Sequence, residues 1–188
     1  MRFFHISDLH IGKQLHYYNL AEDQRAILHQ IVQRGIEYRP DAILVCGDIF
    51  DKSVPSGEAY TIFDEFLNEL ADTLSGIPVL VIGGNHDNPQ RLAYAGSFLE
   101  RNHIHLSVLP PRSEEEHLKK VTLTDEFGKV NFYLLPFLKP GYVRHLFEEG
   151  GVTDYHSAVA AILKRDGLAR EQLCGSGKER HVLLSHQF

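Results

Sequence analysis

The sequence predicts a mixed α/β fold in which helices cover two sheets or one mixed sheet. Short apolar runs alternate with segments of helical periodicity, and the early runs are rich in Ile, Val and Leu with little polar alternation. Residues 121–135 have the pattern of a hairpin, broken at a turn over residues 125–128. This alternation of strands and helices, followed by a hairpin, is typical of layered α/β architectures.

Seven apolar runs are predicted as strands, and in chain order they are residues 2–6, 42–46, 79–82, 104–109, 121–124, 130–135 and 182–184. Each run is far shorter than the roughly 20 residues that a helix needs to cross a bilayer. We therefore expect no membrane span.

The first two predicted helices have start signals in the sequence. Asn19 followed by Glu22 resembles a capping box, and Pro40 stops the helix that follows. Ser56 can cap the second helix through its hydroxyl group. The apolar faces of these helices consist of Ile27, Leu28, Ile31, Val32 and Ile36, and of Tyr60, Phe63, Phe66, Leu67, Leu70 and Leu74.

Two further helices are predicted later in the chain. Asn88 and Pro89 begin the third helix, since proline is tolerated at the first helical position. The fourth lies near residues 154–164, with Thr153 as its cap. The apolar side of the third helix is formed by Leu92, Ala95, Phe98 and Leu99.

Length and composition limit the classes of protein. A chain of 188 residues with 43% hydrophobic and 23% charged residues predicts one globular domain and argues against disorder. The net charge of −6 excludes a uniformly basic nucleic-acid-binding surface but not a local basic groove. Cys46 and Cys174 are too few for a disulfide framework, so we expect a cytoplasmic protein in which Cys46 is a core thiol.

Metal-ligating side chains follow four of the predicted strands. Asp8 and His10 come after the first, Asp48 after the second, Asn85 after the third and His186 after the last. Sites in open α/β sheets form beyond the carboxyl ends of strands, so we expect these side chains to gather in one place. Carboxylate oxygen and imidazole nitrogen without thiolate favour Mn²⁺, Fe²⁺ or Zn²⁺. Two such ions about 3.5–4 Å apart can clamp a phosphoryl group, and Asp48 is the expected bridging ligand.

His86 and Asp87 are expected to have catalytic roles. Because adjacent residues leave a turn in different directions, we assign Asn85 to a metal ion and His86 to the substrate. There His86 would stabilise the transition-state phosphate or protonate the leaving oxygen. Asp87 is expected to orient His86.

Each motif has an ordinary structural explanation when it is taken alone. An isolated Asp-x-His is usually a capped loop, Gly-Asp after a strand is commonly a turn, and a single histidine such as His186 is more often structural. Together, in this order and each at a strand exit, the motifs indicate a site. For the aromatic residues at 16–18 we favour packing beneath a loop over stacking on nucleotide bases.

The motifs at these strand exits resemble the first four signature blocks of the calcineurin-like metallophosphoesterases. The blocks are Asp8-Leu9-His10, Gly47-Asp48-Ile49-Phe50-Asp51, Gly84-Asn85-His86-Asp87 and His186. Within that family, the chain resembles the bacterial SbcD-type nuclease subunits of DNA double-strand-break repair. The segments that carry this closer resemblance are residues 1–13, 47–55 and 83–87.

The resemblance implies a two-sheet αββα core with two divalent metal ions, for which we expect Mn²⁺. It implies catalysis by His86 and metal ligation by Asp8, His10, Asp48, Asn85 and His186. It further implies exonuclease and endonuclease action on DNA, and an SbcC-type ATPase partner with a long coiled coil that controls access to DNA ends. Family members often dimerise through helices in the region of the second and third predicted helices, so we expect a homodimer.

This sequence departs from the family pattern in two ways. Archaeal and eukaryotic relatives have a second active-site histidine near the Gly-Asp block, where this sequence has Asp51, as bacterial members tend to. The family's final Gly-His-x-His block, which completes both metal sites, and its DNA-capping domain do not occur in this sequence. We therefore expect an N-terminal fragment in which the nuclease domain, residues 1–188, is incomplete at its C-terminal end.

Two other functions remain open. The first is another phosphoesterase of the superfamily, either a protein phosphatase or a small-molecule phosphodiesterase. Protein phosphatases usually continue the second block as Asp-Arg-Gly and end the third with Glu, whereas this sequence has Asp51-Lys52-Ser53 and Asp87. The second is a catalytically silent module for docking or dimerisation. The presence of all five expected ligands argues against it for the parent protein, and it stays open for the fragment itself.

Overall fold

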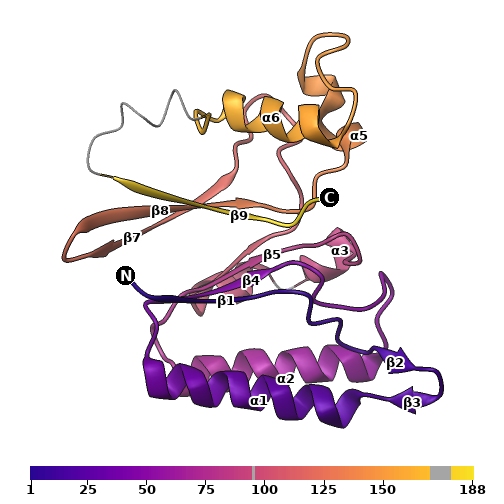
Figure 1. Ribbon diagram of the computed structural model, residues 1–188, viewed down its shortest axis with the longest axis vertical. Coiled ribbons are helices and arrows are strands. Elements are labelled where there is room, and N and C mark those ends of the chain that lie inside the picture. Colours follow the sequence, from indigo (N-terminus) through magenta and orange to yellow (C-terminus); the bar gives the residue numbers. More distant parts are fainter. Residues whose placement is uncertain (95, 170–178) are drawn as a thin grey trace.

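The protein is built from four layers, in the order helices, sheet, sheet, helices (Figure 1). The computed structural model describes residues 1–94, 96–169 and 179–188. Two sheets pack face to face, and each carries helices on its outer side. The structure therefore confirms the expected αββα arrangement and decides in favour of two sheets over one mixed sheet.

The first sheet is parallel and has the strand order β1-β4-β5-β6. Its strands are β1 (Phe3–Ile6), β4 (Ala42–Cys46), β5 (Val79–Ile82) and β6 (Ile104–Ser107). All four lie where the sequence predicts them, although β6 ends two residues earlier than expected. Because the strands are parallel, their carboxyl ends all lie at one edge of the sheet.

The second sheet has the strand order β7-β8-β9. Its strands are β7 (Lys119–Asp125), β8 (Gly128–Leu135) and β9 (Arg180–Ser185). The predicted hairpin is confirmed, since β7 and β8 pair in antiparallel orientation, whereas β9 pairs with β8 in parallel. This parallel pairing requires the chain to leave the sheet after β8 and return to it.

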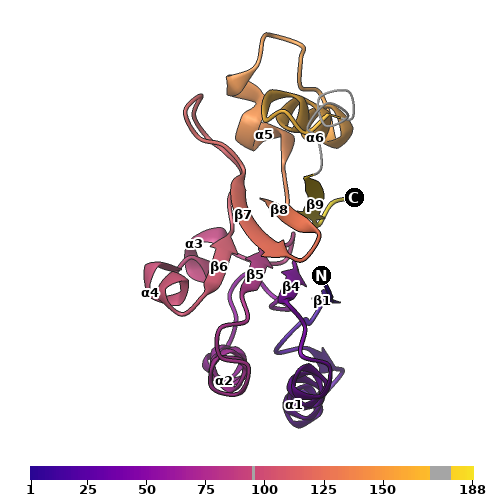
Figure 2. The same ribbon diagram turned by 90° about the vertical axis from the view of Figure 1, so that its left-hand side faces the viewer.

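The helices lie on the outer faces of the sheets (Figure 2). Those against the first sheet are α1 (Ala21–Tyr38) and α2 (Gly57–Thr73), with α3 (Pro89–Leu92) and α4 (Gly96–Arg101) beside β6. Those against the second sheet are α5 (Pro140–Val143), the short 3-10 helix η1 (Arg144–Leu146) and α6 (Tyr155–Arg165). Among the described residues, no helix is long and apolar enough to cross a membrane.

Apolar clusters fill the interfaces between the layers. Along β4, Ile43 packs with α1 and α2, whereas Leu44 and Cys46 pack with the second sheet. This burial on both faces explains why the strand sequence is apolar without interruption. A third cluster joins Leu135 of β8 to Ile162 of α6. Cys46 is the core thiol that the sequence predicts, because its side chain is buried and burial raises its pKa to about 12.

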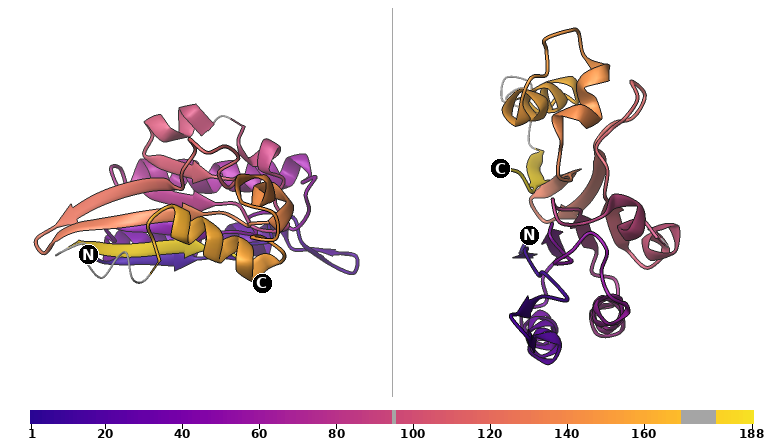
Figure 3. Two further views of the ribbon diagram at one scale, coloured as in Figure 1. Left: turned by 90° about the horizontal axis from the view of Figure 1, so that it is seen from above. Right: turned by 90° about the vertical axis from the view of Figure 1, so that its right-hand side faces the viewer.

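A small hairpin that the sequence did not predict projects from one end of the molecule (Figures 1 and 3). It is formed by β2 (Gln14–Leu15) and β3 (Tyr18–Asn19), which pair in antiparallel orientation. Tyr17 at its tip is fully exposed and Tyr18 is 63% exposed. The expectation that these aromatic side chains pack beneath a loop is therefore wrong.

Two of the four predicted helix starts are confirmed and two are displaced. Ser56 and Asn88 each accept a hydrogen bond from a backbone N–H in the first turn of α2 and α3. The predicted capping box of Asn19 and Glu22 does not form. Asn19 is the last residue of β3, and α1 begins one residue later than predicted, after Leu20. The Asn19 side chain still accepts the backbone N–H of Ala21 at 3.1 Å.

The cap of α6 is also displaced from its predicted position. Asp154, and not Thr153, is the N-terminal cap. The Asp154 carboxylate accepts the N–H of Ser157 at 2.8 Å, and the Ser157 hydroxyl accepts the N–H of Asp154 at 3.0 Å. This reciprocal pair satisfies two backbone N–H groups at once, which a threonine one residue earlier could not do.

The predicted third helix is divided into α3 and α4. The N–H of Tyr94 donates to the carbonyl of Arg91 at 3.2 Å, a spacing of three residues that closes a tight turn instead of continuing the α-helix. Ala95, predicted to lie on the apolar side of this helix, and Cys174 lie outside the described residues.

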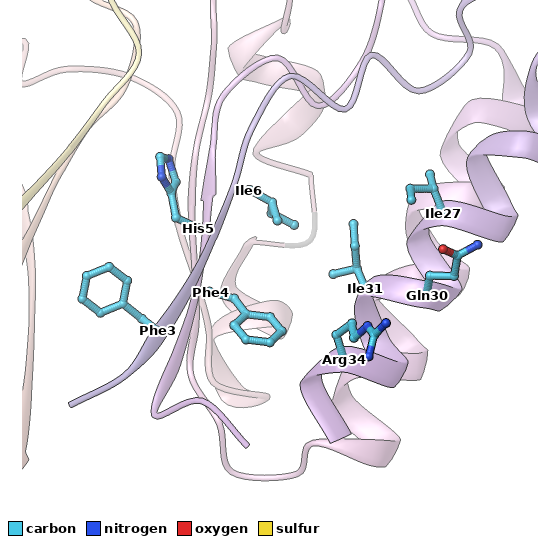
Figure 4. Close-up of a pocket in the computed structure, with 8 residues that line it drawn as sticks. All are labelled: Phe3, Phe4, His5, Ile6, Ile27, Gln30, Ile31 and Arg34. Atoms are coloured by element: carbon cyan, nitrogen blue, oxygen red, sulfur yellow. The ribbon is translucent and has the colours of Figure 1, made fainter. Parts of the chain in front are cut away.

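β1 is the edge strand of the first sheet and leaves a groove beside α1 (Figure 4). Phe4 and Ile6 point toward α1 and face Ile27 and Ile31 across a cavity of about 370 Å³. Ile27 consequently remains 52% exposed, although the sequence places it on the apolar face of the helix. No strand of this sheet lies beyond β1, so this part of the apolar face of α1 is not covered.

Candidate metal centre

The loops that carry the predicted ligands meet at one edge of the sheets. β1, β4 and β5 are parallel neighbours, so the loops that follow them begin side by side. β9 of the second sheet ends beside the same edge, because the His186 ring contacts the last residue of β4. These loops line a cavity of about 530 Å³ whose walls include all five predicted metal ligands, Asp8, His10, Asp48, Asn85 and His186.

Backbone hydrogen bonds join the first two ligand loops. The N–H of Asp8 donates to the carbonyl of Gly47 at 3.1 Å, and that of His10 to the carbonyl of Asp48 at 3.0 Å. Asp8, His10 and Asp48 all have positive φ angles, of 56°, 44° and 49°. Such conformations cost a non-glycine residue roughly 1–3 kcal/mol and cluster at functional sites, where the surrounding structure maintains them. The strained positions coincide with three of the predicted ligands.

Asp48 lies at the centre of the cluster. Its Oδ2 atom is 3.8 Å from Nε2 of His10 and 3.9 Å from Nε2 of His86. The Nε2 atom of His186 is 3.6 Å from the same oxygen. The backbone N–H of His86 donates to the other carboxylate oxygen at 2.9 Å, which fixes the orientation of the carboxylate. Three imidazole rings therefore face one buried carboxylate, which puts Asp48 at the centre, where the predicted bridging ligand is expected.

These spacings fit divalent cations. Two atoms bonded to the same ion at about 2.0–2.2 Å lie at most about 4.4 Å apart. The distances from the Asp48 carboxylate to the three imidazole nitrogens are shorter than this limit, so an ion can bind between them. Within the described part of the chain, two groups of three side chains have ligand atoms within 4.8 Å of one another, and both include Asp48: His10, Asp48 and His86, and Asp8, Asp48 and His186. Oxygen and imidazole donors without thiolate suit Mn²⁺, Fe²⁺ or Zn²⁺.

Asn85 and His186 complete one side of the cluster. The Nε2 atom of His186 lies 3.1 Å from Oδ1 of Asn85, and its Nδ1 atom lies 2.9 Å from the carbonyl oxygen of Cys46. The contact with Cys46 holds the ring so that Nε2 faces the cluster, as is usual for metal-binding histidines. The structure thus brings together all the predicted ligands from loops that are far apart in the sequence.

Two glycines allow the ligand loops to approach one another this closely. Gly47 has a φ of +87°, and a Cβ atom there would lie 2.5 Å from the His186 ring. A Cβ atom on Gly84 would overlap both the backbone nitrogen and the carboxylate of Asp48. The glycines of these two motifs therefore have a steric role in the site.

His86 is held at the mouth of the cluster. Its side chain is 43% exposed, whereas that of Asp48 is 5% exposed. The Nδ1 atom of His86 lies 2.8 Å from the carbonyl oxygen of Asp51, which leaves Nε2 to face the cavity. Its ring also contacts the ring of His10 edge to face, with the centroids 4.9 Å apart. This arrangement leaves the imidazole accessible to a substrate that approaches from solvent.

Among the described residues, no hydrogen bond or ion pair joins Asp87 to the His86 ring, which contradicts the expectation that Asp87 orients this ring directly. Its carboxylate accepts the backbone N–H groups of Ile49 at 3.2 Å, Phe50 at 3.0 Å and Gly84 at 2.8 Å. Burial raises the pKa of the Asp87 carboxyl, and these three hydrogen bonds partly offset the rise. Asp87 therefore ties the loop after β4 to the loop after β5.

Two residues of the site were missed by the sequence analysis. The Asp51 carbonyl orients His86, and its carboxylate lies 3.4 Å from Nδ1 of His10. The available signal was its position as the second aspartate of the Gly-Asp-Ile-Phe-Asp block. The Ser7 hydroxyl donates to the Asp8 carboxylate at 2.6 Å. No sequence signal indicated this contact, since serine is common in loops.

A family model described as calcineurin-like phosphoesterase matches residues 1–186. The match spans both sheets and all four ligand loops. Membership in that family implies metal-dependent hydrolysis of phosphoesters. The layered fold, the gathered oxygen and imidazole ligands and this match agree, and the chain belongs to the calcineurin-like phosphoesterase family.

Proposed function

We propose that this chain carries the active site of a DNA repair nuclease that hydrolyses phosphodiester bonds with Mn²⁺. The family supplies phosphoester hydrolysis, and the SbcD-type segments 1–13, 47–55 and 83–87 support DNA as the substrate. The observation that carries the proposal is the accessibility of the centre. The side chains of Asp8 and His86 are 54% and 43% exposed, so a phosphate within a long polymer has room to reach them.

The residues of the centre divide the chemical work. Bound divalent ions would polarise the phosphoryl group and lower the pKa of an attacking water to about 7. The residues that would hold them are Asp8, His10, Asp48, Asn85 and His186. His86, with Nε2 facing the cavity, stabilises the charge that develops on the phosphate or protonates the leaving oxygen.

The β2–β3 hairpin supports an extended substrate. It follows the loop that carries Asp8 and His10, and it presents the fully exposed ring of Tyr17. Exposed aromatic rings stack on nucleotide bases, at about 1–3 kcal/mol per base. Lys13 precedes the hairpin, with its side chain 45% exposed, and provides a positive charge for the phosphate backbone.

The test is Mn²⁺-dependent cleavage by the natural gene product that contains residues 1–188. We expect it to degrade linear and hairpin DNA. We expect Tyr17→Ala to lower DNA cleavage by about tenfold, the loss of one stacked base, without changing hydrolysis of bis(p-nitrophenyl) phosphate. Phe127→Ala, which removes another largely exposed ring (71%) from the distant β7–β8 turn, is the matched control.

Other outcomes of this assay point to the competing functions. Hydrolysis of phosphopeptides or cyclic nucleotides with intact DNA would show a different phosphoesterase. Absence of hydrolysis of every substrate, with Mn²⁺ bound, would show a silent docking module. The proposal also includes a cytoplasmic location and an SbcC-type ATPase partner, and failure of an ATPase with a long coiled coil to copurify from the native source would remove that partner.

We also propose that the protein forms a homodimer through the surface around α3 and α4. Tyr94 is 85% and Phe98 is 65% exposed, and Tyr94 lines a cavity of about 700 Å³ together with Tyr60. Large exposed apolar side chains gathered in this way are typical of interfaces. We expect sedimentation of a dimer, and of a monomer for the Tyr94→Ser/Phe98→Ser variant.

The control for this experiment is Phe127→Ser, which removes an exposed ring of similar accessibility from the β7–β8 turn. It should sediment like the parent protein. A parent protein that sediments as a monomer at concentrations well above those of the DNA assay would contradict the homodimer.

A further inference from the structure

Asp51 links the loop of His10 to the loop of His86. These two histidines and Asp48 form one of the two groups of possible metal ligands. Its backbone N–H donates to the carbonyl of Ile11 at 3.1 Å, which anchors it to the loop of His10. Its carbonyl oxygen lies 2.8 Å from Nδ1 of His86, on the loop after β5. The backbone of Asp51 is therefore fixed on both sides before its side chain is considered.

The Asp51 side chain faces His10. The Nε2 atom of His10 lies 3.8 Å from carboxylate oxygens of both Asp8 and Asp48, so this nitrogen faces the metal group. The Nδ1 atom on the other side of the ring is buried and makes no hydrogen bond among the described residues. The Oδ1 atom of Asp51 lies 3.4 Å from it. An imidazole that binds a metal through Nε2 carries its proton on Nδ1, where it needs an acceptor.

We propose that Asp51 is a positioning residue for metal binding, whose carboxylate accepts the Nδ1–H of His10 when Nε2 binds an ion. The inference deepens the proposed function, because it assigns the residue that orients one ligand of the same centre. It also gives Asp51 a double role: its side chain orients His10 while its carbonyl orients His86. A single residue therefore contacts both rings.

A competing explanation is that Asp51 serves only to pair with a lysine. The Nζ atom of Lys13 lies 3.4 Å from the same Oδ1 atom of Asp51. The Lys13 side chain is 45% exposed, however, whereas those of Asp51 and His10 are 18% and 20% exposed. Exposed ion pairs contribute little to stability, about 0–1 kcal/mol, so the pair with Lys13 does not account for the placement of the carboxylate. Substitution of Lys13 separates the two explanations.

The experiment measures Mn²⁺ affinity by calorimetry in the absence of DNA, again on the natural gene product. Asp51→Asn keeps the backbone carbonyl and a neutral acceptor, and we expect it to weaken Mn²⁺ binding about tenfold. Asp51→Ala removes the acceptor, and we expect a loss of about 100-fold, the upper end for partners of metal-binding histidines. Asp51→Glu should recover part of the loss. Lys13→Met should leave the affinity within about threefold of the parent protein.

A second readout reports on the His10 ring itself. In ¹⁵N spectra of the Zn²⁺-loaded protein, we expect the Nδ1–H of His10 to exchange slowly with water in the parent protein and rapidly in Asp51→Ala. If Asp51 had only a structural role, a variant with an unchanged thermal unfolding midpoint would also have an unchanged exchange rate of this proton. The thermal unfolding midpoint of each variant shows whether it folds. If Asp51→Ala does not fold, the test uses Asp51→Asn.

Three outcomes would overturn the inference. The first is that Asp51→Asn and Asp51→Ala both bind Mn²⁺ within twofold of the parent affinity. The second is that Lys13→Met loses as much affinity as the Asp51 variants. The third is that the parent protein binds no Mn²⁺. A parent protein that binds Mn²⁺ but leaves DNA intact overturns the proposed nuclease function alone. The comparison of affinities among the variants still decides the role of Asp51 in that case.

Discussion

Replacement of His86 by alanine is expected to lower DNA cleavage by about 10²–10⁴-fold, the usual contribution of a positioned acid or base. The Nε2 atom of His86 faces the cavity, and its partly exposed ring can contact a bound phosphate. Asp8, His10, Asp48, Asn85 and His186 remain in this variant, so Mn²⁺ affinity should stay within about threefold of the parent value. Steady-state cleavage and calorimetry on the same preparations measure the two quantities.

The matched control for this variant is His29→Ala. His29 lies on α1, where its exposed ring pairs with Glu69 at 2.7 Å, and it is not among the residues that line the ligand cavity. Its removal should change neither cleavage nor metal affinity. The structure also permits the opposite result for His86, since its Nε2 atom belongs to a group that could hold an ion. A joint loss of Mn²⁺ affinity and cleavage in His86→Ala would make His86 a ligand and remove its proposed catalytic role.

Much of the site was predictable because it depends on strand direction. A parallel strand delivers the residue that follows it to the same edge as its neighbours, whatever the length of chain between them. Asp8, Asp48 and Asn85 could therefore be placed together from three apolar runs and the polar residues that follow. The apolar sequence of β4 predicted a strand buried on both faces in the same way.

The contacts around the ligands were less predictable, because they depend on where backbone groups of one loop face side chains of another. Asp87 was expected to orient its neighbour His86, yet its carboxylate reaches backbone N–H groups after β4 and β5. Asp51 received no role, yet both its carbonyl and its carboxylate face histidines. Sequence adjacency is a poor guide in such turns, since a small change in φ redirects a side chain completely.

The errors at helix starts have a similar cause. Asn19 has the residue type and spacing of a cap, but pairing within the β2–β3 hairpin places it in a strand. Asp154 and Thr153 are both good caps, and only the reciprocal bond with Ser157 selects Asp154. Ile27 has the periodicity of a core residue, but its exposure depends on where the sheet ends. Each outcome was decided by a partner that local propensity does not specify.

Replacement of Gly84 by alanine is expected to abolish the metal centre. The new Cβ atom would overlap the backbone nitrogen and the carboxylate of Asp48, which is itself held by the N–H of His86. Neither backbone nor buried carboxylate can yield easily, so the loops after β4 and β5 must separate. Overpacking of this kind costs about 1–3 kcal/mol. We expect a lower unfolding midpoint, together with a loss of Mn²⁺ affinity of at least about 100-fold, because Asp48 belongs to both metal groups.

Gly83→Ala is the matched control, since it adds the same methyl group one residue earlier. The Cβ atom at Gly83 would lie 3.5 Å from its nearest neighbour, Cα of Val108, which is ordinary van der Waals contact. This variant should bind Mn²⁺ like the parent protein. Parental Mn²⁺ affinity in Gly84→Ala would mean that Asp48 can move without loss of the ions, which is incompatible with a carboxylate shared between them. Equal losses in both variants would instead reflect general intolerance of this turn, and only a difference between them assigns the effect to the contact with Asp48.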